Sequence, residues 1–319
     1  MHISLLLIAA ALFAVITGAN DGASLLAFNL SSKALRPLTA LAVLIVAVIV
    51  GPLVIGTAVA TTFARGLVPF DVAGGDEALL LAVVTAVALI FVLSRLGLPA
   101  SVTQALTGTI VGIGIGRGLP VDFAVVVRVI VVLVAAPIAA GALSLVVAAV
   151  LLRLRPRHSL RGHLRRLHLV SFGLQALAYA ANDAQKMVAV AAVALGQVDT
   201  TVKAVWPVQI AIGLLFGAGT LIGVTRLGGR VSRLLPVRPL GAIAGGYASA
   251  AAVLASAAIG SPVSMAQASA SALVGAEAVL VTYRRVRWEQ AVRIASVWVT
   301  TLPSAILLAA IVGYVTKVW

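Results

Sequence analysis

The side chains most able to do chemistry form a short polar cluster that occurs twice in otherwise apolar stretches. Asn20-Asp21 and Asn182-Asp183 each follow two small residues. An ionised aspartate at the centre of a bilayer costs about 2.5–3.5 kcal/mol on insertion scales, and such residues mark ion or substrate pathways. Carboxylate and amide oxygens suit a hard cation, and an aspartate can also carry a proton. The two clusters therefore predict an ion site.

A second repeated motif predicts helix starts inside the membrane. Its two copies are Pro99-Ala100-Ser101-Val102-Thr103-Gln104 and Pro262-Val263-Ser264-Met265-Ala266-Gln267. Proline breaks the chain, and the following serine stands where an N-cap residue opens a helix. A helix start offers unpaired N–H groups and about half a positive charge, which suit an anion. We expect two such starts to hold a tetrahedral oxyanion through Ser101, Thr103, Gln104, Ser264 and Gln267.

The composition predicts that these motifs lie in a membrane. Hydrophobic residues make up 62% of the 319 residues, charged residues only 10%, and the mean hydropathy is +1.16. Soluble domains carry about 25% charged residues. Runs such as Val121–Leu152 exceed the roughly 20 residues that cross a bilayer, and they lack the alternation of an outer-membrane barrel. We expect an all-α, polytopic transmembrane protein, with Gly18, Gly22, Gly108 and Gly112 at close helix contacts.

The distribution of charge predicts the topology. The net charge of +14 resides in short loops between spans, which argues against nucleic-acid binding. The most basic stretch, 153–168, is cytoplasmic by the positive-inside rule. About five crossings on either side of it place both termini outside the cytoplasmic membrane. We expect a first transmembrane repeat over 1–152, a basic cytoplasmic loop over 153–168, and a second repeat over 169–319 that runs inverted.

Internal duplication supports this organisation. The Asn-Asp pair recurs after 162 residues, and the Pro-x-Ser motif recurs after 163. Inverted repeats with discontinuous helices are typical of secondary transporters, which hold their substrate near the bilayer midplane. We expect about 5+5 spans, with Asn20, Asp21, Asn182 and Asp183 holding the coupling cation. Lys186 lies near the second pair, where it extends toward the membrane interface, pairs with Asp183 or contacts the substrate.

These ordered motifs resemble the inorganic phosphate transporter (Pit) family of cation-coupled phosphate/sulfate permeases. The segment Gly18-Ala19-Asn20-Asp21-Gly22-Ala23 is similar to the family's Gly-Ala-Asn-Asp-Val-Ala motif, and Asn182-Asp183-Ala184-Gln185-Lys186 is similar to its second-half version in bacterial members. The two Pro-x-Ser segments match its Pro-Val-Ser-Thr-Thr-His motif. The end of the chain, from Trp298-Val299-Thr300-Thr301-Leu302-Pro303, is also similar.

The resemblance implies a symporter, not an enzyme, that imports inorganic phosphate with Na⁺ or H⁺ by alternating access. It implies a homodimer in the bilayer and no cofactor beyond the coupling ion. Asn20, Asn182 and Lys186 would join the substrate ligands, and Asp21 and Asp183 would hold Na⁺ if sodium is the coupling ion.

The chain departs from the family pattern at positions that bear on substrate choice. Gln104 and Gln267 replace histidines, and Val48 and Gly246 stand where the family carries a membrane glutamate in each half. Glutamine donates hydrogen bonds at every pH, so sulfate or another oxyanion is the alternative substrate. More remote alternatives are an intramembrane aspartyl protease built on Asp21 and Asp183, and a passive anion channel. A protease leaves the asparagines, the helix starts and the duplication without a role.

Overall fold

The computed structural model describes residues 2–30, 35–96, 98, 100–153, 160–234 and 238–318, which are almost entirely helical. These residues form no strand, and their one isolated bridge joins Val198 to Val202 in a loop. The prediction of an all-α chain is therefore confirmed over the described residues.

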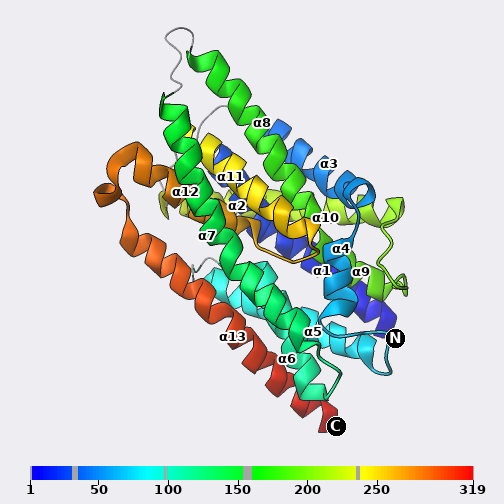
Figure 1. The fold of residues 1–319 in the computed structure, drawn as a ribbon. Coiled ribbons are helices and arrows are strands. Elements are labelled where there is room, and N and C mark those ends of the chain that lie inside the picture. The colour runs from blue at the N-terminus through cyan, green and yellow to red at the C-terminus, as the bar shows by residue number, and fades with distance from the viewer. Residues whose placement is uncertain are drawn as a thin grey trace.

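Long helices alternate with shorter segments along the chain (Figure 1). The helices of the first half are α1 (His2–Thr17), α2 (Ala23–Leu30), α3 (Pro37–Ile55), α4 (Ala58–Thr61), α5 (Gly75–Arg95), α6 (Val102–Arg117) and α7 (Phe123–Arg153). Those of the second half are α8 (Leu160–Ala181), α9 (Gln185–Ala194), α10 (Trp206–Leu234), α11 (Pro239–Ala258), α12 (Met265–Glu277) and α13 (Trp288–Val318). Short π-helical segments lie at Gly18–Gly22, Thr62–Gly66 and Ala278–Thr282, and a 3₁₀ turn lies at Tyr283–Arg285.

The basic segment predicted as a loop over 153–168 is partly helical. Helix α8 begins at Leu160, so the last nine residues of that segment belong to a helix. Residues 154–159, with Arg155 and Arg157 of the basic run, lie outside the described residues, as do Pro99 of the second motif and Gly97, two residues before it.

Several helices of the two halves correspond in order and length. Helices α7 and α13 each contain 31 residues with one internal proline, Pro137 and Pro303. Helices α5 and α6 precede α7 as α11 and α12 precede α13, at displacements of 163 to 165 residues between their first residues. This correspondence agrees with duplication, while the inverted orientation of the second half stays a prediction.

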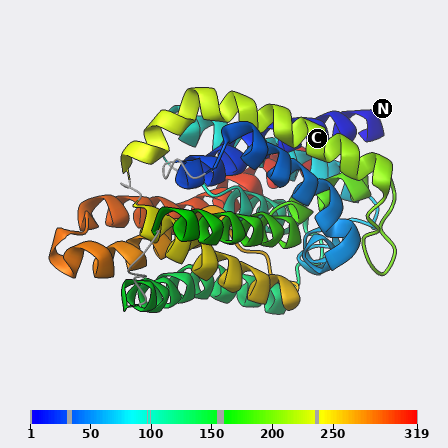
Figure 2. The ribbon, with the colours of Figure 1, turned by 90° about the horizontal axis from the view of Figure 1, so that it is seen from above.

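The helices pack closely where glycines occur. A Cβ added to Gly112 of α6 would lie 2.3 Å from the Ile306 carbonyl oxygen of α13, and one at Gly18 would lie 2.0 Å from the Phe216 carbonyl oxygen of α10. Figure 2 shows α10 running along α1 on one side of the bundle, with α7 on the opposite side. Small residues permit such backbone contact in membranes, as the sequence predicted for these glycines.

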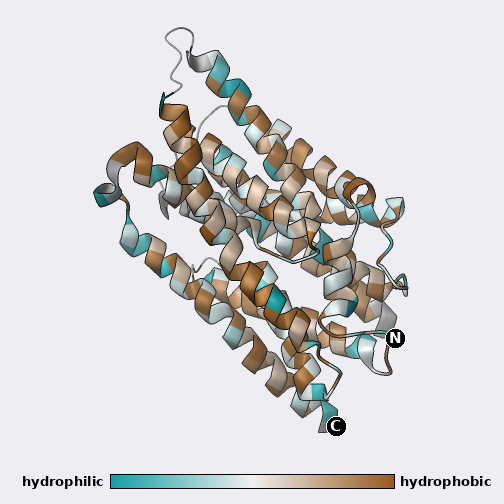
Figure 3. Cartoon of the chain, in the orientation of Figure 1, coloured by the Kyte–Doolittle hydropathy of each residue, from teal (hydrophilic) through white to brown (hydrophobic). Residues whose placement is uncertain are grey.

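The outer surface of the bundle is apolar. Figure 3 shows hydrophobic residues along the outer helices, and Val131, Leu214 and Val299 are 57%, 61% and 74% exposed. Within the described residues, seven helices are long and apolar enough to cross a membrane. Exposure of so much apolar surface to water is unfavourable, whereas the hydrocarbon of a bilayer accommodates it, so the chain is a multi-pass membrane protein.

Candidate substrate and cation site

Both Asn-Asp pairs lie where regular α-helical hydrogen bonding is interrupted. Asn20 and Asp21 fall in the π-helical segment between α1 and α2, and Asn182 and Asp183 fall in the turn between α8 and α9. Gln185 stabilises the second break because its Nε2 donates to the Ala181 carbonyl at 2.7 Å. The first interruption is a π-helical segment within a continuous helix, and the second separates α8 from α9 by a turn. The second therefore has the form of the discontinuous helices of transporters.

The two Pro-x-Ser motifs open helices α6 and α12, as predicted. The Ser101 Oγ accepts a hydrogen bond from the Gln104 N–H at 3.3 Å, and the Ser264 Oγ accepts one from the Gln267 N–H at 3.4 Å. Both serines have extended backbones and are buried. Each is therefore an N-cap that leaves the start of its helix pointing into the protein interior.

The asparagines connect the helix breaks to the extended segments before these starts. Asn20 Nδ2 donates to the Ala100 carbonyl at 3.0 Å. Asn182 Nδ2 donates to the Ser261 carbonyl at 3.0 Å, and its Oδ1 accepts from the Val263 N–H at 2.9 Å. In each half the asparagine thus bonds to the backbone of the segment before a helix start, although to different positions of the motif, and the Asn-Asp pair lies beside that start.

Lys186 occupies the centre of the site. Its Nζ donates to Asp183 Oδ1 at 2.7 Å, to Thr103 Oγ1 at 2.9 Å and to Asp21 Oδ2 at 3.2 Å. The side chains of Lys186, Asp21 and Asp183 are 1%, 2% and 0% exposed. Of the alternatives open for Lys186, the structure shows the pairing with Asp183, and the ammonium joins acids from both halves of the chain. A buried charge needs such partners, since an unpaired one is strongly unfavourable.

Asp183 also caps a helix. Its Oδ2 accepts from the N–H of Met265, the first residue of α12, at 2.9 Å. A carboxylate at a helix N-terminus is stabilised by the helix dipole. Thr103 of α6 also contacts the segment before α12, because its Oγ1 donates to the Val263 carbonyl at 3.1 Å. The starts of α6 and α12 therefore lie next to one another, joined by side chains of the two motifs.

Several buried polar atoms of this region have no hydrogen-bond partner. They are the Oε1 atoms of Gln104 and Gln267, the Oγ of Ser261 and the hydroxyl of Tyr179. Buried polar groups in proteins are nearly always paired, so such atoms mark places where a ligand or water completes the structure. Ser261 and Tyr179 were not among the residues predicted from the sequence, because the first half of the chain has Leu98 in place of Ser261 and Thr17 in place of Tyr179.

The arrangement brings together every residue predicted for the site. Asn20, Asp21, Thr103, Asn182, Asp183 and Lys186 form one network, and Ser101, Gln104, Ser264 and Gln267 lie at the two adjoining helix starts. The ammonium between Asp21 and Asp183 does not suit a protease dyad, in which two carboxylates share a proton.

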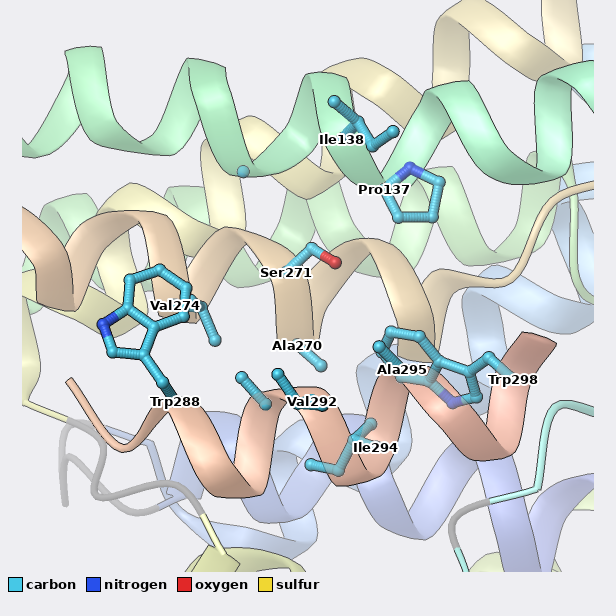
Figure 4. A pocket seen from close by; sticks show the side chains of 12 residues that line it. Pro137, Ile138, Ala270, Ser271, Val274, Trp288, Val292, Ile294, Ala295 and Trp298 are labelled. Atoms are coloured by element: carbon cyan, nitrogen blue, oxygen red, sulfur yellow. The ribbon is translucent and has the colours of Figure 1, made fainter. Parts of the chain in front are cut away.

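An apolar cavity of about 280 Å³ lies elsewhere, between α7, α12 and α13 (Figure 4). Its lining includes Pro137, Trp288 and Trp298, and Ser271 supplies its polar side chain. Without an acid or a base among its lining residues, this cavity does not match the chemistry predicted for an oxyanion.

Fold and site together define a multi-pass membrane transporter with broken helices that meet at a buried polar centre. The model of the phosphate transporter family matches residues 17–309, so the chain belongs to that family. Its members are transporters and not enzymes, as the sequence predicted.

Individual proteins agree with this assignment. The chain is 28% identical over 325 residues to the "Probable low-affinity inorganic phosphate transporter" of Bacillus subtilis (strain 168), covering 98% of this chain and 96% of the relative. It is 31% identical over 320 residues to the protein of the same name from Mycobacterium tuberculosis (strain CDC 1551 / Oshkosh), covering 96% and 75%. A solved structure titled "The sodium-dependent phosphate transporter" has the same fold, with a TM-score of 0.82, 16% identity and 99% of both chains covered.

Proposed function

We propose that the protein imports inorganic phosphate across the cytoplasmic membrane by symport with a cation, Na⁺ or H⁺. The observation that carries this proposal is the meeting of two serine-capped helix starts with two Asn-Asp breaks around one buried ammonium. Family membership and the names of the relatives support phosphate as the substrate.

The chemistry of the site supports an oxyanion ligand. Helix starts supply N–H donors and partial positive charge. The side-chain amides of Gln104 and Gln267 carry NH₂ donors, and their unpaired Oε1 atoms are acceptors that suit a protonated oxygen of the ligand. Ser101, Ser264 and Thr103 add hydroxyl groups, and Lys186 adds a full positive charge. In this proposal these side chains bind phosphate, with Asn20 and Asn182 beside them, while Asp21 and Asp183 serve coupling.

Because the acids and Lys186 are buried, entry of phosphate requires movement of the two halves. We propose alternating access, in which the repeats 1–152 and 169–319 rock about the site and open it to either side in turn. The proposal includes an inverted second half, a cytoplasmic basic segment between the repeats, both termini outside, and a homodimer.

Uptake of labelled phosphate into proteoliposomes tests this function. We expect accumulation above the external concentration when a cation gradient is imposed and no accumulation without one. Equal flux with and without the gradient would instead identify a passive anion channel. Lack of phosphate uptake under every gradient would refute the proposal.

Sulfate is the second candidate, favoured by the glutamines at both helix starts. Gln104 and Gln267 do not titrate, so they hydrogen-bond a dianion equally at any pH. Labelled sulfate in the same vesicles distinguishes the two substrates. Uptake of sulfate that excess phosphate does not reduce would assign the protein to sulfate.

A further inference from the structure

The two halves of α13 differ in how they pack. The second half lies against α6, because Cβ atoms added to the α6 glycines would meet the carbonyl oxygens of Leu302, Ile306 and Ala310. Helices α7 and α12 pack on each other in a similar way, since a Cβ added to Gly275 would lie 2.1 Å from the Gly141 carbonyl oxygen. The first half of α13 faces this pair of helices across the apolar cavity (Figure 4).

The cavity is a slot that opens toward the bilayer. Figure 4 shows Trp288 and Trp298 at opposite ends of its α13 wall, with Val292 between them. The two tryptophans are ten residues apart in α13, which corresponds to a length of about 15 Å. Ile138 and Val292 line the cavity and are also exposed on the outer surface. Half of a hydrocarbon core is about 15 Å thick, so the slot has the length of one acyl chain.

The end of the cavity at Trp288 has the composition of a membrane–water interface. The Trp288 Nε1 donates to the Tyr283 carbonyl at 3.0 Å, and the centroids of the two rings lie 4.8 Å apart. Tryptophan and tyrosine gather at the headgroup level of bilayers. Arg284 and Arg287 adjoin this pair in the chain and are exposed. An amphipathic ligand would meet apolar walls along the cavity and positive charge at its mouth.

Further arginines make this end of the bundle basic. Helices α7, α11 and α12 meet here, because each contributes an alanine to one buried cluster. Arg153 ends α7, and Arg238 precedes α11 and lies 3.9 Å from Glu277 of α12. With the two arginines of the turn, they outnumber Glu277 and Glu289, the described acids of this end. The topology predicted from the sequence places this end in the cytoplasm, where the leaflet surface is anionic.

We propose that this cavity binds one acyl chain of an anionic phospholipid, whose headgroup lies against Arg284 and Arg287. The site is separate from the buried polar centre and goes beyond phosphate transport. Hydrocarbon in the cavity gains dispersion contacts with its walls. The arginines attract a negatively charged headgroup more strongly than a zwitterionic one. Shape and charge together select an anionic lipid of the cytoplasmic leaflet.

A helix from a second copy of the chain fits the cavity less well. A helix with its side chains is about 10 Å in diameter, so about 15 Å of it needs several times the volume of the cavity, which is about 280 Å³. A hydrocarbon chain is much narrower and follows the slot between the two tryptophans.

The proposed lipid would support a helix of the central site. Ala270 and Val274 of α12 line the cavity. The same helix begins at Met265, whose N–H donates to Asp183. A chain bound between α12 and α13 would therefore hold α12 in place, and its removal should lower the stability of the protein.

Lipid binding to the delipidated protein in detergent tests the proposal. Native mass spectrometry and thermal unfolding are measured with phosphatidylglycerol and with phosphatidylcholine of the same acyl chains. We expect one phosphatidylglycerol per chain, bound about tenfold more tightly than phosphatidylcholine, and a higher unfolding midpoint. Equal affinity for the two lipids would overturn the proposal. Displacement of the lipid by inorganic phosphate would place its headgroup at the central site and would also overturn it.

A variant that fills the cavity provides a second test. Ala295 lines the cavity, so Ala295→Phe should weaken phosphatidylglycerol binding by about tenfold or more. Ala135→Phe is the matched control, because Ala135 is exposed on α7 outside the cavity lining. Lipid binding by Ala295→Phe equal to that of the control would contradict the proposal. Loss of a dimer in Ala295→Phe with lipid binding unchanged would show that a second copy covers the cavity instead.

Charge variants test the headgroup contact. Arg284→Gln combined with Arg287→Gln should remove the preference for phosphatidylglycerol and leave phosphatidylcholine binding unchanged. Arg165→Gln combined with Arg166→Gln is the matched control, because both arginines are exposed near the start of α8. An equal effect of the two double variants would overturn the assignment of the headgroup to Arg284 and Arg287.

Fluorescence quenching decides if Ala295→Phe does not fold. The chain has four tryptophans, so Trp206→Phe combined with Trp319→Phe leaves the two that line the cavity. Phosphatidylglycerol with brominated acyl chains should quench Trp288 and Trp298 more than brominated phosphatidylcholine at the same mole fraction. Equal quenching by the two lipids would overturn the proposal.

Discussion

The asparagines of the repeated motif position the site through backbone contacts. Both polar atoms of the Asn182 amide are used, one by the Ser261 carbonyl and one by the Val263 N–H. Asn20 donates to the Ala100 carbonyl at 3.0 Å and to Asp21 Oδ1 at 2.8 Å. The aspartates beside them are thereby held at fixed positions relative to the helix starts.

Replacement of Asn182 tests this positioning role. Asn182→Ala leaves two buried backbone groups, the Ser261 carbonyl and the Val263 N–H, without hydrogen-bond partners. Each unpaired group destabilises the folded protein by about 1–3 kcal/mol. We expect a lower midpoint of thermal unfolding in detergent and weaker phosphate binding. Replacement of Asn29 is no suitable control, because it too is buried and bonded to Gln175. Thr225→Ala is the control, because Thr225 is exposed and its hydroxyl donates to the Ile222 carbonyl of its own helix. This variant should leave the unfolding midpoint and phosphate binding unchanged.

The aspartates are expected to be essential for coupling. Asp21→Asn or Asp183→Asn removes one of the two negative charges around Lys186, so concentrative phosphate uptake should fall to the level of empty vesicles. Size-exclusion chromatography checks that the variants remain folded. Asp199→Asn is the matched control, because Asp199 is exposed and pairs with Lys203 away from the site. Unchanged uptake in either buried variant would contradict the role in coupling.

The capping serines are expected to control substrate affinity. Loss of an N-cap costs about 0.5–2 kcal/mol, and loss of two loosens both helix starts that face the anion. Ser101→Ala combined with Ser264→Ala should therefore weaken phosphate binding by about tenfold, which corresponds to about 1.4 kcal/mol. Ser144→Ala is a matched control, since Ser144 is buried in α7 without a hydrogen-bond partner. Equal binding by the double variant and the control would count against the serines as ligands.

At the level of elements, the contact between α6 and α13 holds one helix start in place. Gly112 and Gly116 of α6 lie against the backbone of α13, where an added Cβ would approach the Ile306 and Ala310 carbonyl oxygens to 2.3 Å. Helix α6, with 16 residues, lies along the C-terminal half of α13, which has 31 (Figure 1). Because α6 begins at the site, displacement of this helix would move Thr103 and Gln104.

A larger residue in this contact should destabilise the protein and impair transport. Gly112→Ala forces the two backbones apart, and overpacking of this kind costs about 1–3 kcal/mol. The unfolding midpoint in detergent and phosphate uptake should both decrease. Gly173→Ala in α8 is the control, because nothing lies within 4 Å of a Cβ added there. If both variants unfold at the same temperature, the close contact is not important for stability.

The sequence predicted those features that depend on local motifs. The Ser101 and Ser264 caps follow from proline, serine and an apolar run within six residues, and the repeat of each motif predicted that the Asn-Asp pairs meet the helix starts. The network of Asn29, Gln175, Ser249 and Ser269 was not predicted. Asn29 and Gln175 are 146 residues apart, and neither recurs in a motif, so only the packing of the helices reveals their contact.

The central position of Lys186 also required the fold. Its pairing with Asp183 follows from a spacing of three residues, whereas its contacts with Asp21 and Thr103 span 165 and 83 residues. A sequence alone does not set the direction of a long side chain at a helix break.

At the scale of the whole molecule, the apolar outer surface requires a bilayer, and charge should set the orientation. The described loops near Val72 and Asp199 carry acidic residues, among them Asp71, which pairs with Arg65 at 2.9 Å. Helix α8 begins with a basic run at the other end of the predicted topology. Because cytoplasmic loops are enriched in Lys and Arg, the start of α8 should face the cytoplasm and Val72 the outside.

Labelling of introduced cysteines tests this orientation without background, since the chain has no cysteine. Val72 and Gly162 are both exposed, so Val72→Cys and Gly162→Cys should leave the fold intact. A membrane-impermeant maleimide should label Val72→Cys on intact cells and label Gly162→Cys only after permeabilisation. The unaltered protein, which has no cysteine, is the control and should not be labelled in either preparation. The reverse pattern would show that the topology is inverted. Labelling of both cysteines on intact cells would place both positions on the same side of the membrane, which contradicts the predicted odd number of crossings between them.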